Sequence, residues 1–181
     1  MPHFVVLLRG VNVGKGNRLP MADFRALLEA QGFTDVRTIL NSGNAVVSST
    51  GRSAAGHAKR VAATLQDSLG LNVNVVVKSA SEFRKVVKES EFVPPTDDHS
   101  RFFVAFAQQK TQLQALSVLE SLVKPPDRFF IGGQAVYMYC PGGILESKAG
   151  SALLGKIGRA VTSRNWATVL KLERLLLERV P

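Results

Sequence analysis

The first eighty residues carry six apolar segments whose spacing alternates between a two-residue repeat and a repeat of about 3.6, and this alternation constrains the fold most strongly. Four segments fit strands and two fit amphipathic helices, in the order βαββαβ. The strands are expected at 3–9, 36–40, 45–49 and 73–77, and the helices at 21–28 and 58–69. This is the order of the ferredoxin-like split βαβ unit, in which right-handed crossovers place both helices on one face of an antiparallel sheet.

The second half of the chain begins the same order again. The expected strands are 102–107, 128–131 and 135–140, with a helix at about 113–123. Where a fourth strand should follow, the sequence has helical patterns at 153–161 and 166–177. The expected fold class is therefore α/β in the α+β sense, with two ferredoxin-like βαββαβ-type units, the second incomplete and ending in helices.

Residues 91–100 separate the two expected units. The segment contains Pro94-Pro95 and Asp97-Asp98, residue types that favour turns over regular structure. Before it, Ser79 and Glu82 form a capping box that predicts one further helix. The expected domains are 1–90, the first ferredoxin-like unit with a glycine-rich loop; 91–100, a linker; and 101–181, the second unit with C-terminal helices.

Positive charge is concentrated at the two ends of the chain. The 181 residues include 23 Lys and Arg against 14 Asp and Glu, so the formal charge is +9 and the pI about 10.1. Counting along the sequence gives +5 for residues 1–60, 0 for 61–145 and +4 for 146–181. If the fold brings the ends together, their fields add and favour anionic partners, whereas separate ends would serve mainly solubility.

Several kinds of site are disfavoured. The single cysteine, Cys140, cannot form an intrachain disulfide, and with three histidines it falls short of the usual structural zinc ligand set. The sequence calls for no metal and no cofactor. No stretch approaches the roughly 20 apolar residues of a membrane helix. The chain is expected to be a soluble, cytoplasmic protein with no membrane partner.

A glycine-rich loop, Gly10–Asn17, lies between the first strand and the first helix, where backbone N–H groups can turn toward an anion. It is not a Walker A loop, because three residues instead of four separate its first glycine from the Gly-Lys pair, and a glycine instead of Ser or Thr follows the lysine. Two interpretations stay open: an anion site, or glycines that only supply positive φ angles. Arg9, Lys15 and Arg18, with no acidic residue before Asp23, favour the anion slightly.

A second polar cluster is Thr162–Trp166. Its hydroxyl residues are expected to cap the last helix, on which Arg164, Thr168 and Lys171 would share one face. That face is either solvated or in contact with a ligand. Trp166 is favoured as a core anchor over a ring that stacks on a base.

The remaining reactive or aromatic residues favour structural roles. Tyr137 and Tyr139 are expected to pack in the core, because the sequence lacks the opening of the RNA-recognition signature. Cys140 is expected to be an inert, half-buried thiol, since every histidine is far away in sequence. No acid pair has catalytic or metal-binding spacing, and the sequence carries no positive sign of an enzyme.

Three motifs occur in order along the chain. They are Arg9-Gly10-Val11-Asn12-Val13-Gly14 with Asn17 and Met21, then Gly32-Phe33 with Val36, Thr38 and Ser42-Gly43-Asn44, and finally Arg164-Asn165-Trp166 with Thr168-Val169 and Lys171-Leu172. Together they resemble the DUF1697 family. The resemblance implies a bacterial-type, cytosolic α/β protein of about this length, and it supplies no catalytic residues. The family's first loop typically reads Gly-Gly-Lys-Asn, so the lysine of Gly14-Lys15-Gly16-Asn17 is shifted by one position here.

The leading hypothesis is an anion-binding protein for a nucleotide, a phosphorylated metabolite or nucleic acid. The expected ligand-binding residues are Arg9, Asn12, Lys15, Asn17, Ser42, Asn44, Arg164, Asn165 and Lys171. One alternative is a small enzyme that acts on a phosphorylated substrate, with Asn and Arg side chains polarising an oxyanion. Another is a protein interaction module whose sheet pairs with a partner or with a second copy of the chain, as a homo-oligomer.

Overall fold

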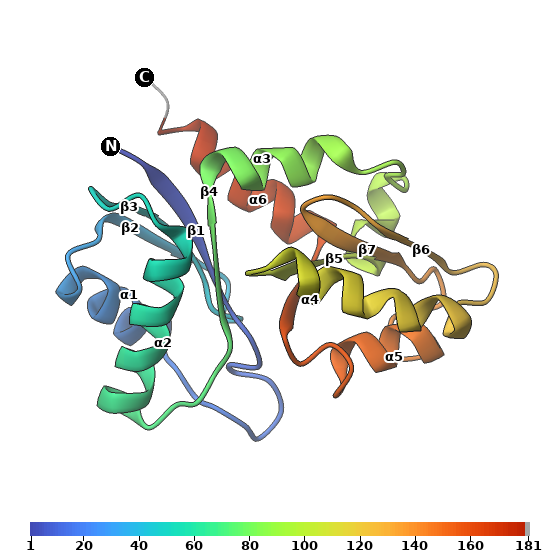
Figure 1. Cartoon of the computed structure of the whole chain (residues 1–181), viewed down its shortest axis with the longest axis horizontal. Coiled ribbons are helices and arrows are strands. Elements are labelled where there is room, and N and C mark those ends of the chain that lie inside the picture. The colour runs from blue at the N-terminus through green and yellow to red at the C-terminus, as the bar shows by residue number, and fades with distance from the viewer. Residues whose placement is uncertain (180–181) are drawn as a thin grey trace. The chain divides into compact units, whose positions relative to one another are not determined.

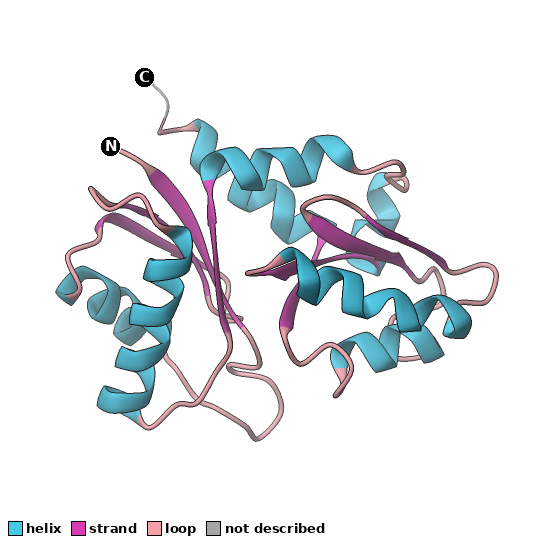
Figure 2. Cartoon of the chain, in the orientation of Figure 1, coloured by secondary structure: helices cyan, strands magenta, loops and turns pink. Residues whose placement is uncertain are grey.

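The order βαββαβ occurs twice within residues 1–179, the part of the chain that the computed structural model describes (Figure 1). Residues 180 and 181, the last two of the expected second unit, lie outside the described residues. The chain divides into two units. Unit 1 comprises Met1–Phe83 and the segment from Leu172 onward, and unit 2 comprises Arg84–Lys171. The described residues therefore form a mixed α/β protein with two four-stranded antiparallel sheets (Figure 2).

Unit 1 contains the first sheet, in the strand order β2-β3-β1-β4. Its strands are β1 (His3–Leu8), β2 (Thr34–Ile39), β3 (Asn44–Ser48) and β4 (Val75–Ser79), and its helices are α1 (Met21–Ala30) and α2 (Ala54–Leu69). Alternate residues of β1, namely Phe4, Val6 and Leu8, share one buried cluster with Phe24 of α1 and Val61 of α2. This two-residue alternation puts one face of the sheet against the helices.

Local signals fix the ends of these helices. Ser53 caps α2 by accepting a hydrogen bond from the N–H of Gly56 at 3.0 Å. Gly70 ends α2 in the left-handed conformation, at a φ of 65°. The predicted capping box is confirmed before α3 (Ala80–Glu89): Glu82 N–H donates to Ser79 Oγ at 3.2 Å, and Ser79 N–H donates to Glu82 Oε2 at 2.8 Å.

Unit 2 contains the second sheet, in the order β6-β7-β5-β8. Its strands are β5 (Phe102–Ala107), β6 (Arg128–Ile131), β7 (Ala135–Tyr139) and β8 (Val161–Asn165). The prediction that this sheet lacks its last strand was wrong, because β8 pairs with β5 over five residues. Four of the five β8 residues are polar, so the strand shows no apolar alternation in the sequence. The preceding helix does not continue to Val161 as expected. It is α5, which spans Lys148–Leu154, and Val161 is the first residue of β8.

The helical region of unit 2 also differs from the expectation. Instead of one helix over 113–123, a short α4 (Lys110–Gln114) leads into a 3-10 helix, η2 (Ala115–Leu122). The buried leucines explain the change: Leu113, Leu116 and Leu119 recur every three residues, the period of a 3-10 helix. A second 3-10 helix, η1 (Thr96–Arg101), occupies part of the expected linker, and α6 (Trp166–Leu177) follows β8.

No helix within residues 1–179 is long and apolar enough to cross a membrane. The same residues bring no three His, Cys, Asp or Glu side chains together in a group that could hold a metal ion.

Candidate functional site

The glycine-rich loop leaves the end of β1 in a series of left-handed turns. Gly10, Asn12 and Gly14 have φ angles of 68°, 56° and 57°. The loop closes on itself through a hydrogen bond of 2.7 Å from Asn12 N–H to the Asn17 carbonyl. Residues other than glycine rarely adopt such angles. Asn12 must therefore be held in place by its surroundings.

The Asn12 side chain supplies that constraint. Its amide nitrogen donates to the carbonyls of Leu19 and Asn41, each at 2.7 Å, and its Oδ1 accepts the Leu19 N–H at 2.9 Å. Asn12 thus joins the start and end of the glycine loop to the turn between β2 and β3. Both amide hydrogens of Asn12 are used within the protein, so this side chain builds the loop.

The β2–β3 turn lies directly beside the end of β1. The N–H of Leu8 donates to the Gly43 carbonyl at 2.9 Å, and a Cβ on Gly43 would lie only 2.6 Å from the Cβ of Leu8. The Asn44 side chain is buried and donates to the Ile39 carbonyl at 3.1 Å and to Ser42 Oγ at 2.9 Å. Asn44 and Ser42 therefore shape the turn, as Asn12 shapes the loop.

We call the surface formed by residues 9–18 and 41–44 the glycine-loop rim. Lys15 is exposed on the loop, and Asn17 is half-buried. Arg18 is also exposed, and its guanidinium donates to the Gly14 carbonyl at 2.8 Å. Arg9 is half-buried, and this burial lowers the pKa of its guanidinium. Six of the nine predicted ligand-binding residues lie in this rim of unit 1.

The other three predicted residues lie in unit 2, in places the sequence did not indicate. Arg164 belongs to β8 and not to the last helix, so the expected helical stripe with Thr168 and Lys171 was wrong. Thr168 is itself buried, while Lys171 is exposed on α6. Asn165, not a hydroxyl residue, caps α6: its Oδ1 accepts the Thr168 N–H at 3.0 Å.

Arg164 is a buried cation. Its side chain has 7% exposure, and its NH1 donates to Thr162 Oγ1 and to the Ser163 carbonyl, each at 2.8 Å. Burial lowers the pKa of its guanidinium to about 10, so the group stays charged at neutral pH. The hydrogen bonds around the buried guanidinium offset part of the free-energy cost of removing its charge from water.

The prediction of core packing is confirmed for Trp166 and Tyr137, whereas Tyr139 is only partly buried. Trp166 is buried with its ring 5.1 Å from that of Phe102, and Tyr137 is fully buried. The hydroxyl of Tyr139 donates to Asp98 Oδ2 at 2.5 Å. Cys140 is more deeply buried than expected, and burial raises the pKa of its thiol to about 11.

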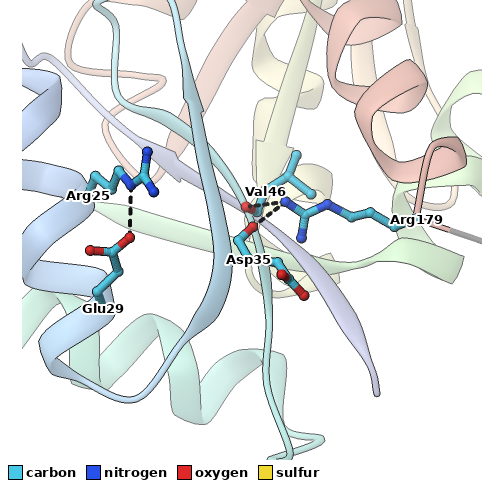
Figure 3. Close-up of polar contacts among 5 residues, drawn as sticks. All are labelled: Arg25, Glu29, Asp35, Val46 and Arg179. Atoms are coloured by element: carbon cyan, nitrogen blue, oxygen red, sulfur yellow. Dashed lines mark hydrogen bonds and ion pairs between the residues drawn. The ribbon is translucent and has the colours of Figure 1, made fainter.

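A cluster that the sequence did not reveal lies at the far end of β3 (Figure 3). The guanidinium of Arg179 donates to the carbonyls of Asp35 and Val46 and to Ser48 Oγ. Asp35 has a φ of 48° and sits at an irregularity in the pairing of β2 with β3, which frees its carbonyl for Arg179. His3 Nδ1 lies 2.9 Å from the same Ser48 hydroxyl.

This cluster joins the C-terminal segment of the chain to β2 and β3 within unit 1. The segment adds no net positive charge there, because Arg174 and Arg179 are balanced by Glu173 and Glu178, and the other basic residues after position 146 lie in unit 2. Arg37 forms an ion pair of 3.1 Å with Glu178. Burial is the main cause that lowers the pKa of Arg179, and the positive charge of Arg37 lowers it further. The meeting point is at the Ser48 end of β3, however, whereas the glycine-loop rim is at the Asn44 end. Figure 3 also shows the exposed pair Arg25–Glu29 on α1, which has the ordinary spacing of a surface helix pair.

Two cavities lie away from the predicted residues. One in unit 2, of about 350 Å³, is lined by residues of 122–127 and 142–148. The other, of about 520 Å³, lies between α1 and α2 of unit 1 and is lined mainly by Ala26, Leu27, Ala30 and Leu69. No predicted ligand-binding residue lines either cavity.

Comparison with known proteins gives a family and a fold. The family model described as "Protein of unknown function (DUF1697)" matches residues 1–137. A solved structure of a conserved bacterial protein from Streptococcus pneumoniae is similar with a TM-score of 0.78 and 22% sequence identity, over 97% of this chain and 98% of that one. At this identity the likeness shows the fold alone. A search of curated proteins finds no match.

Proposed function

The chain belongs to the DUF1697 family, and from that premise we propose that it binds a small phosphate-bearing ligand at the glycine-loop rim of unit 1. The observation that carries the proposal is the exposed Lys15 on a loop whose backbone is held in left-handed turns by Asn12. Such turns direct successive N–H groups to one side, where they attract an anion.

The charge around the loop supports the same ligand class. Arg9, Lys15 and Arg18 precede the first acidic residue of the sequence, Asp23. A lysine ammonium acts on phosphate as a compact point charge and needs no fixed geometry. The lysine therefore provides attraction, while the backbone of the loop provides shape. Asn12, Ser42 and Asn44 contribute by holding the loop and the turn in place.

The proposal is tested by thermal unfolding with a panel of nucleotides, sugar phosphates, pyrophosphate and short RNA and DNA. A ligand at 100 times its dissociation constant adds about 2.7 kcal/mol to stability. For a chain of this size, each kcal/mol raises the unfolding midpoint by roughly 2–4 °C. Lys15→Ala should lose the shift, and Lys59→Ala, which removes an exposed lysine of α2, should keep it.

Four outcomes have different meanings. A shift that Lys15→Ala abolishes supports binding at the rim. A shift that both variants keep places the ligand elsewhere, and a flat panel removes the proposal. Turnover of any compound in the panel would replace simple binding by catalysis on a phosphorylated substrate.

We infer further that each unit is ferredoxin-like. The support is the strand order, in which the first and third strands of each unit are central neighbours and a helical segment follows each of them. In this arrangement the glycine-loop rim lies where β1 leaves a central position in its sheet, so a rigid strand anchors the loop at its start.

A further inference from the structure

The side chain of Glu89, the last residue of α3, is surrounded by hydrogen-bond donors of the turn between β6 and β7. Its Oε1 accepts the N–H groups of Gln134 at 2.9 Å and Ala135 at 3.2 Å. Its Oε2 accepts the N–H of Gly133 at 3.0 Å. Three successive backbone amides therefore converge on one carboxylate, which is the geometry of an anion-binding nest.

The hydroxyl of Tyr137 adds a fourth donor. It lies 2.9 Å from Glu89 Oε1 and 2.7 Å from the Val86 carbonyl, so its single hydrogen serves one of two acceptors. The ring is fully buried and stacks on Phe130 with centroids 4.5 Å apart. Burial and the neighbouring carboxylate raise the pKa of this phenol, so it remains a donor throughout the ordinary pH range.

The turn is shaped closely around the carboxylate. A Cβ on Gly132 would lie 2.5 Å from Glu89 Oε1, whereas a Cβ on Gly133 would lie at an ordinary 3.4 Å from Oε2. The turn itself is closed by the Gly132 N–H, which donates to the Ala135 carbonyl at 2.8 Å. The fit is therefore to the carboxylate group, and Gly132 is the residue that permits its approach.

The position of Glu89 on its own helix makes the interaction informative. A negative charge at the C-terminal end of a helix is unfavourable, because the last carbonyls already carry partial negative charge. Helix stability therefore does not account for a glutamate at this position. The donors of the turn account for it, since charge-assisted hydrogen bonds are stronger than neutral ones.

We propose that the β6–β7 turn is a carboxylate-binding nest in its own right, which Glu89 occupies as an internal ligand and which accepts a small carboxylate from solution when that side chain is removed. This site lies in unit 2 and is independent of the glycine-loop rim. The ligand class is a monocarboxylate the size of acetate, because Glu89→Ala removes one methylene and one carboxylate.

The test compares the unfolding midpoint of the full chain in sodium acetate and in sodium chloride of equal concentration. Glu89→Ala lowers the midpoint in chloride, and acetate recovers a large part of the loss. Glu89→Gln is also destabilised but gains nothing from acetate, because its own side chain fills the nest. Glu91→Ala, which removes an exposed neighbouring carboxylate, behaves as the wild type in both salts.

Two glycine variants locate the bound acetate. In the Glu89→Ala background, Gly132→Ala abolishes the recovery, since its methyl group occupies the carboxylate position, whereas Gly133→Ala leaves it intact. In amide NMR spectra of Glu89→Ala, acetate shifts the signals of Gly133, Gln134 and Ala135. If Glu89→Ala is unfolded in chloride, recovery of its circular dichroism by acetate is the same result.

Several results overturn the proposal. One is an equal response of Glu89→Ala to acetate and chloride, and another is an acetate response shared by Glu91→Ala and the wild type. Recovery that survives Gly132→Ala also overturns it, because the acetate would then bind outside the nest.

Discussion

Single residues in this chain show how burial controls the chemistry of a side chain. Cys140 and Tyr137 are both fully buried, and in both burial raises the pKa of the acidic group. Lys78 is buried too, and burial lowers the pKa of its ammonium despite the opposing charge of Glu82. In each case the charged form is disfavoured because the interior solvates it less well than water does.

Cys140 should therefore be unreactive in the folded protein. Its pKa of about 11, against an ordinary 9.0, keeps the thiolate scarce, and its burial blocks access. A thiol reagent at mildly alkaline pH should label the native chain far more slowly than the denatured chain. Fast labelling of the native chain would contradict the prediction.

The raised pKa of Cys140 also makes the stability of the protein depend on pH. The folded state retains the thiol proton to a higher pH than the unfolded state, so this contribution to stability is complete below pH 9 and is lost as the pH rises through 11.

Arg179 should contribute substantially to the free energy of unfolding, although it lies away from the candidate site. Arg179→Ala leaves the Asp35 and Val46 carbonyls and Ser48 Oγ without this donor, so we expect a loss of about 1–3 kcal/mol in unfolding free energy. Urea denaturation measures the loss. The matched variant is Arg174→Ala, which removes an exposed guanidinium from α6 and should change stability by at most about 0.5 kcal/mol. Equal effects of the two variants would contradict the role of Arg179.

At the scale of secondary-structure elements, two hairpin turns at the sheet ends are closely packed against their neighbours. Gly43 lies against Leu8, and Gly132 lies against Glu89, so each β-hairpin turn is pressed against another part of its own unit. Short glycine turns are usually explained by their φ angles alone. Here close approach of neighbouring atoms adds a second requirement.

Gly43 and Gly32 separate these two requirements. Both have positive φ angles, of 80° and 84°, but only at Gly43 would a Cβ meet other atoms. Gly32→Ala should therefore cost about 1–2 kcal/mol, the penalty of a left-handed alanine. Gly43→Ala should cost a further 1–3 kcal/mol, roughly, because the methyl group overpacks the turn. Chemical denaturation of both variants gives the comparison, and similar losses would mean that the turn relaxes around the added atom.

Much of the fold could be predicted from local patterns, since most strands and helices have the expected repeats and the capping box before α3 is where it was expected. The exceptions have physical reasons. Strand β8 is buried although it consists mainly of polar residues, and a buried Arg164 cannot be recognised from a hydrophobic pattern. Leu113, Leu116 and Leu119 have the period of a 3-10 helix, but residues three apart also share a face of an α-helix, so their spacing does not distinguish the two.

The candidate site was predictable only in part. The glycine-loop rim follows from adjacent segments of one unit, so its position could be inferred from the strand order. The contacts of Glu89 with the β6–β7 turn span 44 to 48 residues, and those of Arg179 span 131 to 144. Partners at such separations carry no spacing signal in a single sequence.

At the scale of the whole molecule, unit 1 is discontinuous along the chain. It contains the N-terminal sheet and also the segment from Leu172 onward, with unit 2 between them. Destabilising that C-terminal segment should therefore affect the strands of unit 1 first, although they lie more than ninety residues away in sequence.

Leu176 provides the test. It is fully buried, whereas the adjacent Leu177 is 54% exposed. Leu176→Ala should cost about 2–5 kcal/mol, as large-to-small changes in a core do, and Leu177→Ala should cost far less. Hydrogen exchange in Leu176→Ala should rise in β1 to β4 and stay low in β5 to β7. A uniform rise in both units would show that they open as one cooperative structure.

The discontinuity of unit 1 has a consequence for synthesis on the ribosome. Translation releases the chain from its N-terminus, so every residue of unit 2 has been made before Leu172 and Arg179 are added. The unit whose strands emerge first is therefore the unit that is completed last. Until then β2 and β3 lack the Arg179 guanidinium that bridges their irregular pairing. A nascent chain stopped before Leu172 would contain every residue of unit 2 while unit 1 still lacked its C-terminal segment.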